Sequence, residues 1–89
     1  RKKVHHIGWN SVSIQKDHKY LKDIPDKIDF YFVNSYVFEP LNNKNIIGKT
    51  NYDVDFCSII SKENIFGTQF HPEKSSKAGR ILLKNFLNA

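Results

Sequence analysis

Residues 67–75, with the sequence GTQFHPEKS, constrain the fold of this 89-residue chain more than any other stretch. Its first residues, together with the preceding Phe66, are typical of a strand leaving a hydrophobic core. Pro72 has no N–H to give to a sheet ladder, so we expect the strand to end there, at an edge of the sheet. In an extended chain the side chains of His71 and Glu73 point the same way. The sequence therefore predicts an imidazole beside a carboxylate at the end of a strand.

An imidazole next to a carboxylate indicates proton-transfer chemistry. His71 can accept a proton, and Glu73 can fix the tautomer of the ring and stabilise its charged form. A lone His-x-Glu triplet is more often a solvated pair on a protein surface, so it needs support from its context. The pair forms half of a nucleophile-activating relay, and the nucleophile has to come from elsewhere.

Cys57 is the only cysteine of the chain, which excludes an internal disulfide and a multi-cysteine metal site. It stands inside the apolar residues 56–60, where a free cysteine is usually a small buried hydrophobe. A catalytic cysteine needs exposure at a sharp turn and help from helix N–H groups. We therefore predict that Cys57 is buried and is not the nucleophile.

Composition indicates one small globular domain, because 39% of the residues are hydrophobic. The formal net charge is +5, but apart from residues 1–3 the basic residues are scattered, so we expect no nucleic-acid partner.

No apolar run approaches the roughly 18 residues of a membrane span, and we expect a cytoplasmic protein without a membrane partner. His5 and His6 face opposite sides of a strand, so we expect no metal site. Gly48-Lys49-Thr50 lacks the upstream glycine of a phosphate loop, and we expect no cofactor.

The hydrophobic pattern predicts several strands and a final helix. Residues 29–40 carry aromatic side chains on both alternations, which predicts a central strand buried on both faces. Residues 11–15 and 46–52 indicate shorter strands, and residues 53–55 a turn. Residues 56–60 and 65–70 indicate a hairpin.

The remaining segments are predicted to be a loop and a helix. Residues 16–28 indicate a loop with one helical turn near residues 20–24, and we expect His18 to be exposed there without a partner. Ser75 or Ser76 can cap a helix over residues 77–87, whose apolar face should pack on the sheet.

Residues 69–75 (QFHPEKS) resemble the C-terminal signature of the class I glutamine amidotransferases, the Cys-His-Glu glutaminases. The resemblance implies that His71 and Glu73 are the histidine and the glutamate of that triad. Residues 6–10 (HIGWN) are similar to the Pro-His-x-Gly-Trp-Asn motif of one branch, the glutaminase subunits of imidazole glycerol phosphate synthase. This chain has His5 where that branch has proline.

Residues 32–36 (FVNSY) are similar to the Phe-Val-His-Ser-Tyr strand of the family, with Asn34 in place of the histidine. The resemblance implies that Ser35 and Tyr36 line the glutamine pocket, largely through their backbone. It also makes Trp9 and Lys74 candidates for a partner interface, which an aromatic anchor and a rim charge would suit. Core packing of Trp9 and simple solvation of Lys74 are the alternatives.

The resemblance covers nearly the whole chain and implies an α/β fold. Residues 1–89 would be the C-terminal, strand-rich portion of a single three-layer glutaminase domain, ending in a helix. The parent sheet would be largely parallel, and the nucleophile-bearing N-terminal half would be missing from this chain. The chain alone would then be inactive.

The implied substrate is glutamine, and the implied heterodimer partner is a (β/α) barrel cyclase subunit that takes up the ammonia in histidine biosynthesis. Two alternatives stay open. The chain could belong to a related amidotransferase that feeds ammonia into another pathway. It could also be a catalytically silent, glutaminase-like interaction module.

Overall fold

The computed structural model describes residues 2–37, 42–52, 54–63 and 65–88. Within these residues the chain forms five strands, three short 3-10 turns and one α-helix. In chain order they are β1 (Lys2–Ile14), η1 (Lys19–Leu21), β2 (Ile28–Val37), η2 (Asn43–Asn45), β3 (Ile46–Tyr52), β4 (Val54–Lys62), β5 (Ile65–Thr68), η3 (Pro72–Lys74) and α1 (Ser76–Leu87).

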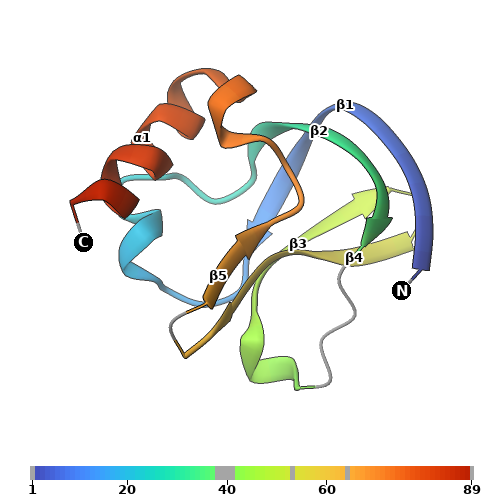
Figure 1. Ribbon diagram of the computed structural model, residues 1–89, viewed down its shortest axis with the longest axis horizontal. Coiled ribbons are helices and arrows are strands. Elements are labelled where there is room, and N and C mark those ends of the chain that lie inside the picture. The colour runs from blue at the N-terminus through green and yellow to red at the C-terminus, as the bar shows by residue number, and fades with distance from the viewer. Residues whose placement is uncertain (1, 38–41, 53, 64, 89) are drawn as a thin grey trace.

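The strands form one antiparallel sheet in the order β2-β1-β3-β4-β5. The long strand β1 pairs with β2 over most of its length and with β3 only at its end, where Ser13 lies opposite Lys49. An isolated bridge joins Phe32 of β2 to Phe70, just after β5. The sheet therefore curls until its two outer strands, β2 and β5, approach each other. The helix α1 and the turn η1 lie beside the place where these strands meet (Figure 1).

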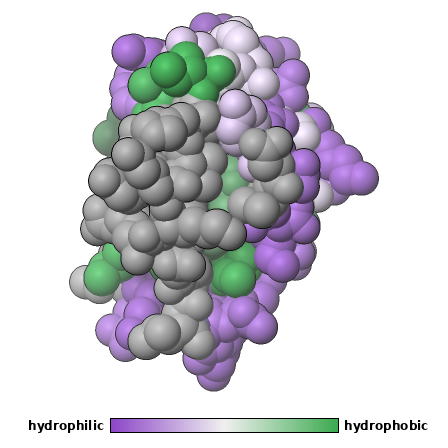
Figure 2. All heavy atoms as spheres, turned by 90° about the vertical axis from the view of Figure 1, so that its right-hand side faces the viewer, coloured by the Kyte–Doolittle hydropathy of each residue, from purple (hydrophilic) through white to green (hydrophobic). Residues whose placement is uncertain are grey.

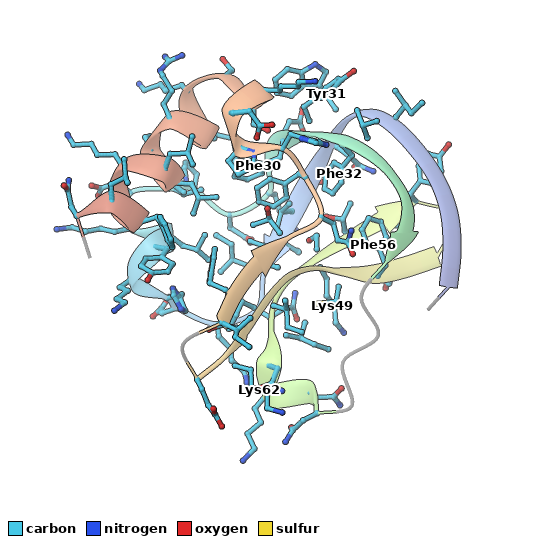
Figure 3. All side chains as sticks on the ribbon, in the orientation of Figure 1. Phe30, Tyr31, Phe32, Lys49, Phe56 and Lys62 are labelled. Atoms are coloured by element: carbon cyan, nitrogen blue, oxygen red, sulfur yellow. The ribbon has the colours of Figure 1, made fainter. Side chains whose placement is uncertain are left out.

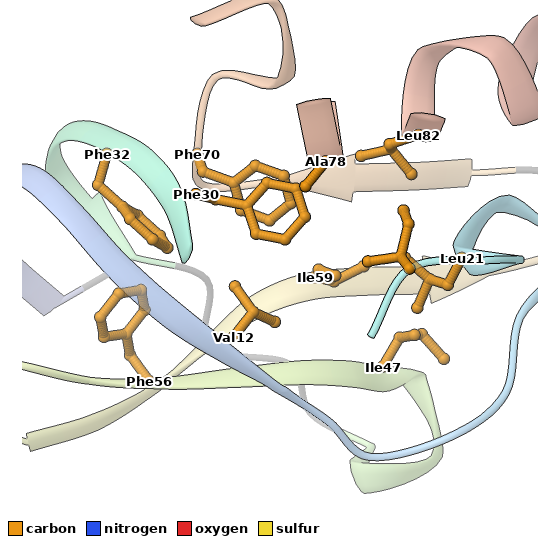
Figure 4. Packing of buried hydrophobic residues seen from close by; sticks show 11 residues of the cluster. Val12, Leu21, Phe30, Phe32, Ile47, Phe56, Ile59, Phe70, Ala78 and Leu82 are labelled. Carbon is orange, nitrogen blue, oxygen red and sulfur yellow. The ribbon is translucent and has the colours of Figure 1, made fainter. Parts of the chain in front are cut away.

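Aromatic side chains fill the space inside the curl. The ring of Phe70 stacks on Phe30 with centroids 4.1 Å apart and meets Phe32 edge-on (Figure 4). The helix α1 contributes Ala78 and Leu82 to the same core. Because Phe70 immediately precedes His71, this packing fixes the place where the candidate relay begins.

Several sequence-based predictions are confirmed. The strand-rich α/β character and the C-terminal helix are present, and so is the hairpin, with β4 and β5 paired antiparallel. Cys57 is buried within β4, as expected. The helical turn near residues 20–24 is present but lies earlier, at Lys19–Leu21.

The prediction of a central strand buried on both faces over residues 29–40 is wrong for the described part. β2 is an outer strand in the sheet order, and only one of its faces is buried. Phe30 and Phe32 point into the core while Tyr31 lies on the outer side (Figure 3). Val33 is 42% exposed on that same outer side. The aromatic pattern did not distinguish Tyr31, whose ring packs on Trp9, from a core residue.

Three local predictions also need correction. Val54 and Asp55 belong to β4 rather than to a turn, because Tyr52 already pairs with Val54. His18 is half-buried and bonded rather than exposed and alone. The apolar face of α1 is only partly covered, since its last turns leave large hydrophobic side chains exposed, namely Leu83, Phe86 and Leu87.

In the described part of the chain, no helix has the length and apolar character needed to cross a membrane. Across the same residues, no group of three or more His, Cys, Asp or Glu side chains is arranged to hold a metal ion.

Candidate active site

His71 and Glu73 lie side by side at the point where the chain leaves β5. The Nδ1 atom of His71 is 3.0 Å from the Oε2 atom of Glu73. We assign Nδ1–H as the donor, because an ionised carboxylate can only accept. The neutral ring then carries a lone pair on Nε2, which has no hydrogen-bond partner among the described residues. This tautomer leaves Nε2 able to accept a proton.

The pair is open to solvent, with 38% of the His71 side chain and 59% of the Glu73 side chain exposed. The hydrogen bond from His71 lowers the pKa of the Glu73 carboxyl below its ordinary value, and the residue's own N–H adds to this effect. Glu73 is therefore ionised throughout the neutral range and can stabilise a positive charge on the imidazole.

The predicted pairing is present, but the predicted extended backbone is not. Residues Pro72–Lys74 form a 3-10 turn, with the N–H of Lys74 bonded to the carbonyl of His71 at 3.1 Å. Pro72 starts this turn, where its missing N–H costs nothing. The two side chains do lie side by side as predicted, but the 3-10 turn brings them together and strand alternation does not.

The backbone of His71 is tied to β2. Its N–H donates to the carbonyl of Tyr31 at 2.9 Å. The Ser75 hydroxyl donates to the His71 carbonyl at 2.5 Å and accepts from the Tyr31 N–H at 2.9 Å. Ser75 was expected to be a possible helix cap, yet its side chain makes no cap bond to α1. Its hydroxyl instead joins the candidate site to the sheet.

Gly79, in the first turns of α1, is a second residue that sequence reasoning missed. A Cβ atom at this position would lie 1.9 Å from the carbonyl oxygen of Pro72. The helix can therefore pack against η3 only with glycine there. The available signal was a glycine inside an amphipathic helix, which costs about 1 kcal/mol relative to alanine and usually has a packing reason.

Cys57 cannot serve this site as a nucleophile. Its side chain is only 5% exposed, and its thiol donates to the carbonyl of Ile59 at 3.2 Å. Burial raises the pKa of the Cys57 thiol to about 11. The reactive thiolate is therefore scarce at neutral pH.

The other candidate residues lie on β1, β2 and η3. Ser35 and Tyr36 belong to β2, where Tyr36 lies opposite Lys3, and their side chains lie outside the described part. Trp9 is 52% exposed, which argues against core packing, and its ring meets Tyr31 edge-on at 5.6 Å. Lys74 is exposed in the turn that carries Glu73.

A sequence profile described as "Glutamine amidotransferase class-I" matches residues 1–89. The chain belongs to the class-I glutamine amidotransferases. Among curated members of this amidotransferase family, it is 51% identical over 88 residues to "Imidazole glycerol phosphate synthase subunit HisH" of Neisseria meningitidis serogroup B. That match covers 99% of this chain and 42% of the relative.

Two further relatives carry the same name. The protein of Buchnera aphidicola subsp. Acyrthosiphon pisum is 55% identical over 82 residues, covering 92% of this chain and 41% of the relative. That of Methanocaldococcus jannaschii is 48% identical over 85 residues, covering 96% and 43%. This amidotransferase chain thus spans about two fifths of the length of the curated relatives it matches.

Proposed function

We propose that this chain is the part of a glutaminase subunit of imidazole glycerol phosphate synthase that supplies the histidine and glutamate of the catalytic triad. The reaction would hydrolyse glutamine to glutamate and ammonia. The observation that carries the proposal is the His71–Glu73 pair, with Nδ1 bonded to the carboxylate at 3.0 Å and Nε2 available. The names of the relatives support the choice of the synthase.

In this mechanism Nε2 of His71 takes the proton of a cysteine thiol, and the thiolate attacks the amide carbon of glutamine. The imidazolium then gives its proton to the departing nitrogen, so that ammonia leaves and a thioester remains. A water molecule, deprotonated by Nε2, attacks the thioester and releases glutamate. Glu73 holds the Nδ1–H throughout and stabilises the imidazolium in both half-reactions.

The cysteine of this mechanism has to come from a nucleophile-bearing N-terminal half of the same domain. Cys57 is excluded by its burial and its raised pKa. We therefore propose that the chain is inactive alone and completes a three-layer α/β domain with that half. We also propose that the protein acts in the cytoplasm.

Glutamine would bind next to β2. We propose that Ser35 and Tyr36 contact it through their backbone groups, since both belong to the strand that anchors His71 through Tyr31. Replacing Ser35 with proline should abolish glutamine binding, because proline has no N–H, whereas Ser35→Ala should change little. Equal affinity of the two variants in a glutamine titration would remove the basis for this assignment.

The ammonia would pass to a (β/α) barrel cyclase subunit. We propose that Trp9 and Lys74 contact this subunit, because both are exposed close to the candidate relay. Trp9 packs against Tyr31, whose carbonyl binds the His71 N–H. Figure 2 shows separate patches of hydrophobic atoms on the face that forms the right-hand side of Figure 1. On β1, Ile7 is 74% and Trp9 52% exposed. An exposed aromatic side chain beside apolar neighbours suits an interface anchor.

The test compares two activities of the assembled enzyme, meaning this chain with the nucleophile-bearing half and the cyclase subunit. His71→Ala should reduce glutamine-dependent turnover by about 10²- to 10⁴-fold, the range expected for general acid–base catalysis. Turnover with added ammonia should persist, because it bypasses the glutaminase step. The matched control is His18→Ala, which should leave the ratio of the two activities unchanged. Equal loss of both activities in His71→Ala would show that His71 is structural.

A further inference from the structure

We propose that Ser75 is a positioning residue for His71 and that Gly79 provides the space this arrangement needs. The inference rests on the proposed function, in which the ring of His71 transfers protons. Ser75 acts through the backbone of His71 and not on the reacting atoms. No other described residue joins the carbonyl of His71 to the sheet through a side chain.

The hydroxyl of Ser75 closes a ring of hydrogen bonds between two segments. His71 donates its N–H to the carbonyl of Tyr31 at 2.9 Å. The Ser75 hydroxyl connects the same two residues a second time, because it donates to the His71 carbonyl at 2.5 Å and accepts from the Tyr31 N–H at 2.9 Å. Ser75 is only 1% exposed, so water cannot replace these bonds readily. Both polar groups of the His71 backbone are thus fixed relative to β2.

The ring of His71 depends on this attachment because its hydrogen-bond partner is itself open to solvent. Its side chain is 38% exposed, and its hydrogen-bond partner, Glu73, has a side chain that is 59% exposed. A side chain that is not packed takes its direction mainly from its backbone and its rotamer. The position of Nε2 is therefore set largely by the backbone that Ser75 and Tyr31 hold.

Gly79 allows Ser75 to occupy this place. Its N–H donates to the carbonyl of Ser75 at 3.2 Å, so Ser75 lies one helical turn before it. A Cβ atom on residue 79 would come within 1.9 Å of the Pro72 carbonyl oxygen and 2.9 Å of the Ser75 Cβ atom. An alanine would therefore push η3 and the start of α1 apart and move the residues that follow His71.

The first test is Ser75→Ala in the assembled enzyme. Without the hydroxyl, the His71 carbonyl loses its side-chain donor and the Tyr31 N–H loses its acceptor. A shift of the ring by about 1 Å should lower kcat for glutamine by roughly 10- to 100-fold. The KM for glutamine and the ammonia-dependent turnover should stay near their original values. Gly79→Ala should give the same pattern without deleting any hydrogen-bonding group.

Ser58→Ala is the matched control. The Ser58 side chain is 0% exposed and its hydroxyl accepts from Thr50 Oγ1 at 2.9 Å, so this change also removes one buried hydroxyl. Ser58 lies on β4, and its hydroxyl bonds to Thr50 rather than to the His71 backbone; only its carbonyl, which the variant keeps, accepts the N–H of Gln69. Ser58→Ala should therefore lower stability, as the loss of a buried hydrogen bond does, without a selective loss of glutamine-dependent kcat.

The outcomes separate this proposal from the proposed function. Failure of His71→Ala to lower the glutamine-dependent activity selectively would overturn both. If His71→Ala is selective but Ser75→Ala and Gly79→Ala behave like Ser58→Ala, the positioning role alone is overturned. Where Ser75→Ala does not fold, Ser75→Cys carries the same test, because it keeps the size of the side chain and weakens its hydrogen bonds.

Discussion

Two regions of the molecule, around His71 and around His18, each contain an imidazole ring, and the two rings differ in their hydrogen bonds. At His71, Nδ1 is bonded to the carboxylate of Glu73 and the ring is open to solvent. At His18, Nδ1 accepts the N–H of Tyr20 at 3.1 Å and Nε2 lies 3.3 Å from the hydroxyl of Ser61. The His18 ring also packs on Tyr20 and Phe66 with centroid distances of 4.8 Å.

The difference teaches that partners decide what a histidine can do. Because Tyr20 donates to Nδ1, neutral His18 carries its proton on Nε2 and uses both nitrogens in structural bonds. Burial lowers the pKa of His18 below its ordinary value, and the charge of Lys19 adds to this effect. His71 has the reverse tautomer, a free Nε2 and a hydrogen bond from Nδ1 to a carboxylate. Of these two histidines, only His71 is suited to carry a proton between reactants.

The largest effect in this comparison, beyond loss of the His71 ring itself, should come from Glu73→Gln. The change keeps the shape of the side chain but removes the charge that stabilises the imidazolium. Glutamine-dependent turnover should fall roughly 10- to 100-fold, the range expected for losing a hydrogen bond to a charged group. Steady-state kinetics of the assembled enzyme measures it, with ammonia-dependent turnover as the control. Undiminished glutamine turnover would mean that Glu73 takes no part in the relay.

A smaller effect, on stability rather than on chemistry, should come from His18→Ala. The free energy of unfolding should fall by about 2 kcal/mol, roughly half from the lost helix cap and half from the lost aromatic contacts. The matched change His71→Ala should alter it by less than about 0.5 kcal/mol, since the bond between His71 and Glu73 is exposed to solvent and such pairs contribute little. Urea unfolding of the assembled domain measures both. Similar losses for the two variants would contradict the claim that His18 contributes to stability and His71 does not.

The pH dependence of stability should separate the two regions further. The folded state binds a proton on His18 more weakly than the unfolded chain, whose histidine pKa is near 6.5. The contribution of His18 is therefore complete above that pH and declines as the pH falls through and below it. His18→Asn keeps a capping oxygen without a titrating ring, so this acid-side decline should be reduced in the variant. Superimposable pH profiles for the two proteins would contradict the assignment.

The smallest effect should come from Cys57→Ala, which extends the comparison to a third group that can hold a proton. The thiol is buried and its pKa is raised to about 11. Both activities of the assembled enzyme should therefore stay unchanged, and iodoacetamide should label Cys57 only in the unfolded protein. Loss of glutamine-dependent activity alone in this variant would make Cys57 a candidate nucleophile after all.

Local pattern predicted much of this fold. Alternation found β3 and the hairpin, and helical periodicity with a serine start found α1 to within a residue. These features depend on neighbours in sequence. The pattern could not show that the sheet curls until Phe32 meets Phe70, and so it misplaced β2 at the centre.

The candidate site shows the same division. His71 and Glu73 were predicted because the sequence motif places them two residues apart. The hydrogen bond from the Tyr31 N–H to the Ser75 hydroxyl joins residues 44 positions apart, and no local sequence pattern contains it. Gly79 was overlooked because the atom that a Cβ there would meet, the Pro72 carbonyl oxygen, lies in the turn that precedes the helix. His18 was expected to have no partner. One partner, the Tyr20 N–H, is only two residues away, whereas the other, Ser61, lies 43 residues away and no local pattern contains it.

The most direct test of the central claim is the tautomer of each histidine, measured by ¹⁵N NMR on the assembled domain with labelled histidine. Spectra taken at about pH 8.5, well above the usual imidazole pKa, report which ring nitrogen carries the proton. We predict that His71 carries it on Nδ1, leaving Nε2 unprotonated, and that His18 carries it on Nε2. A proton on Nε2 of His71 would leave that ring without a free base toward the nucleophile and would contradict the account.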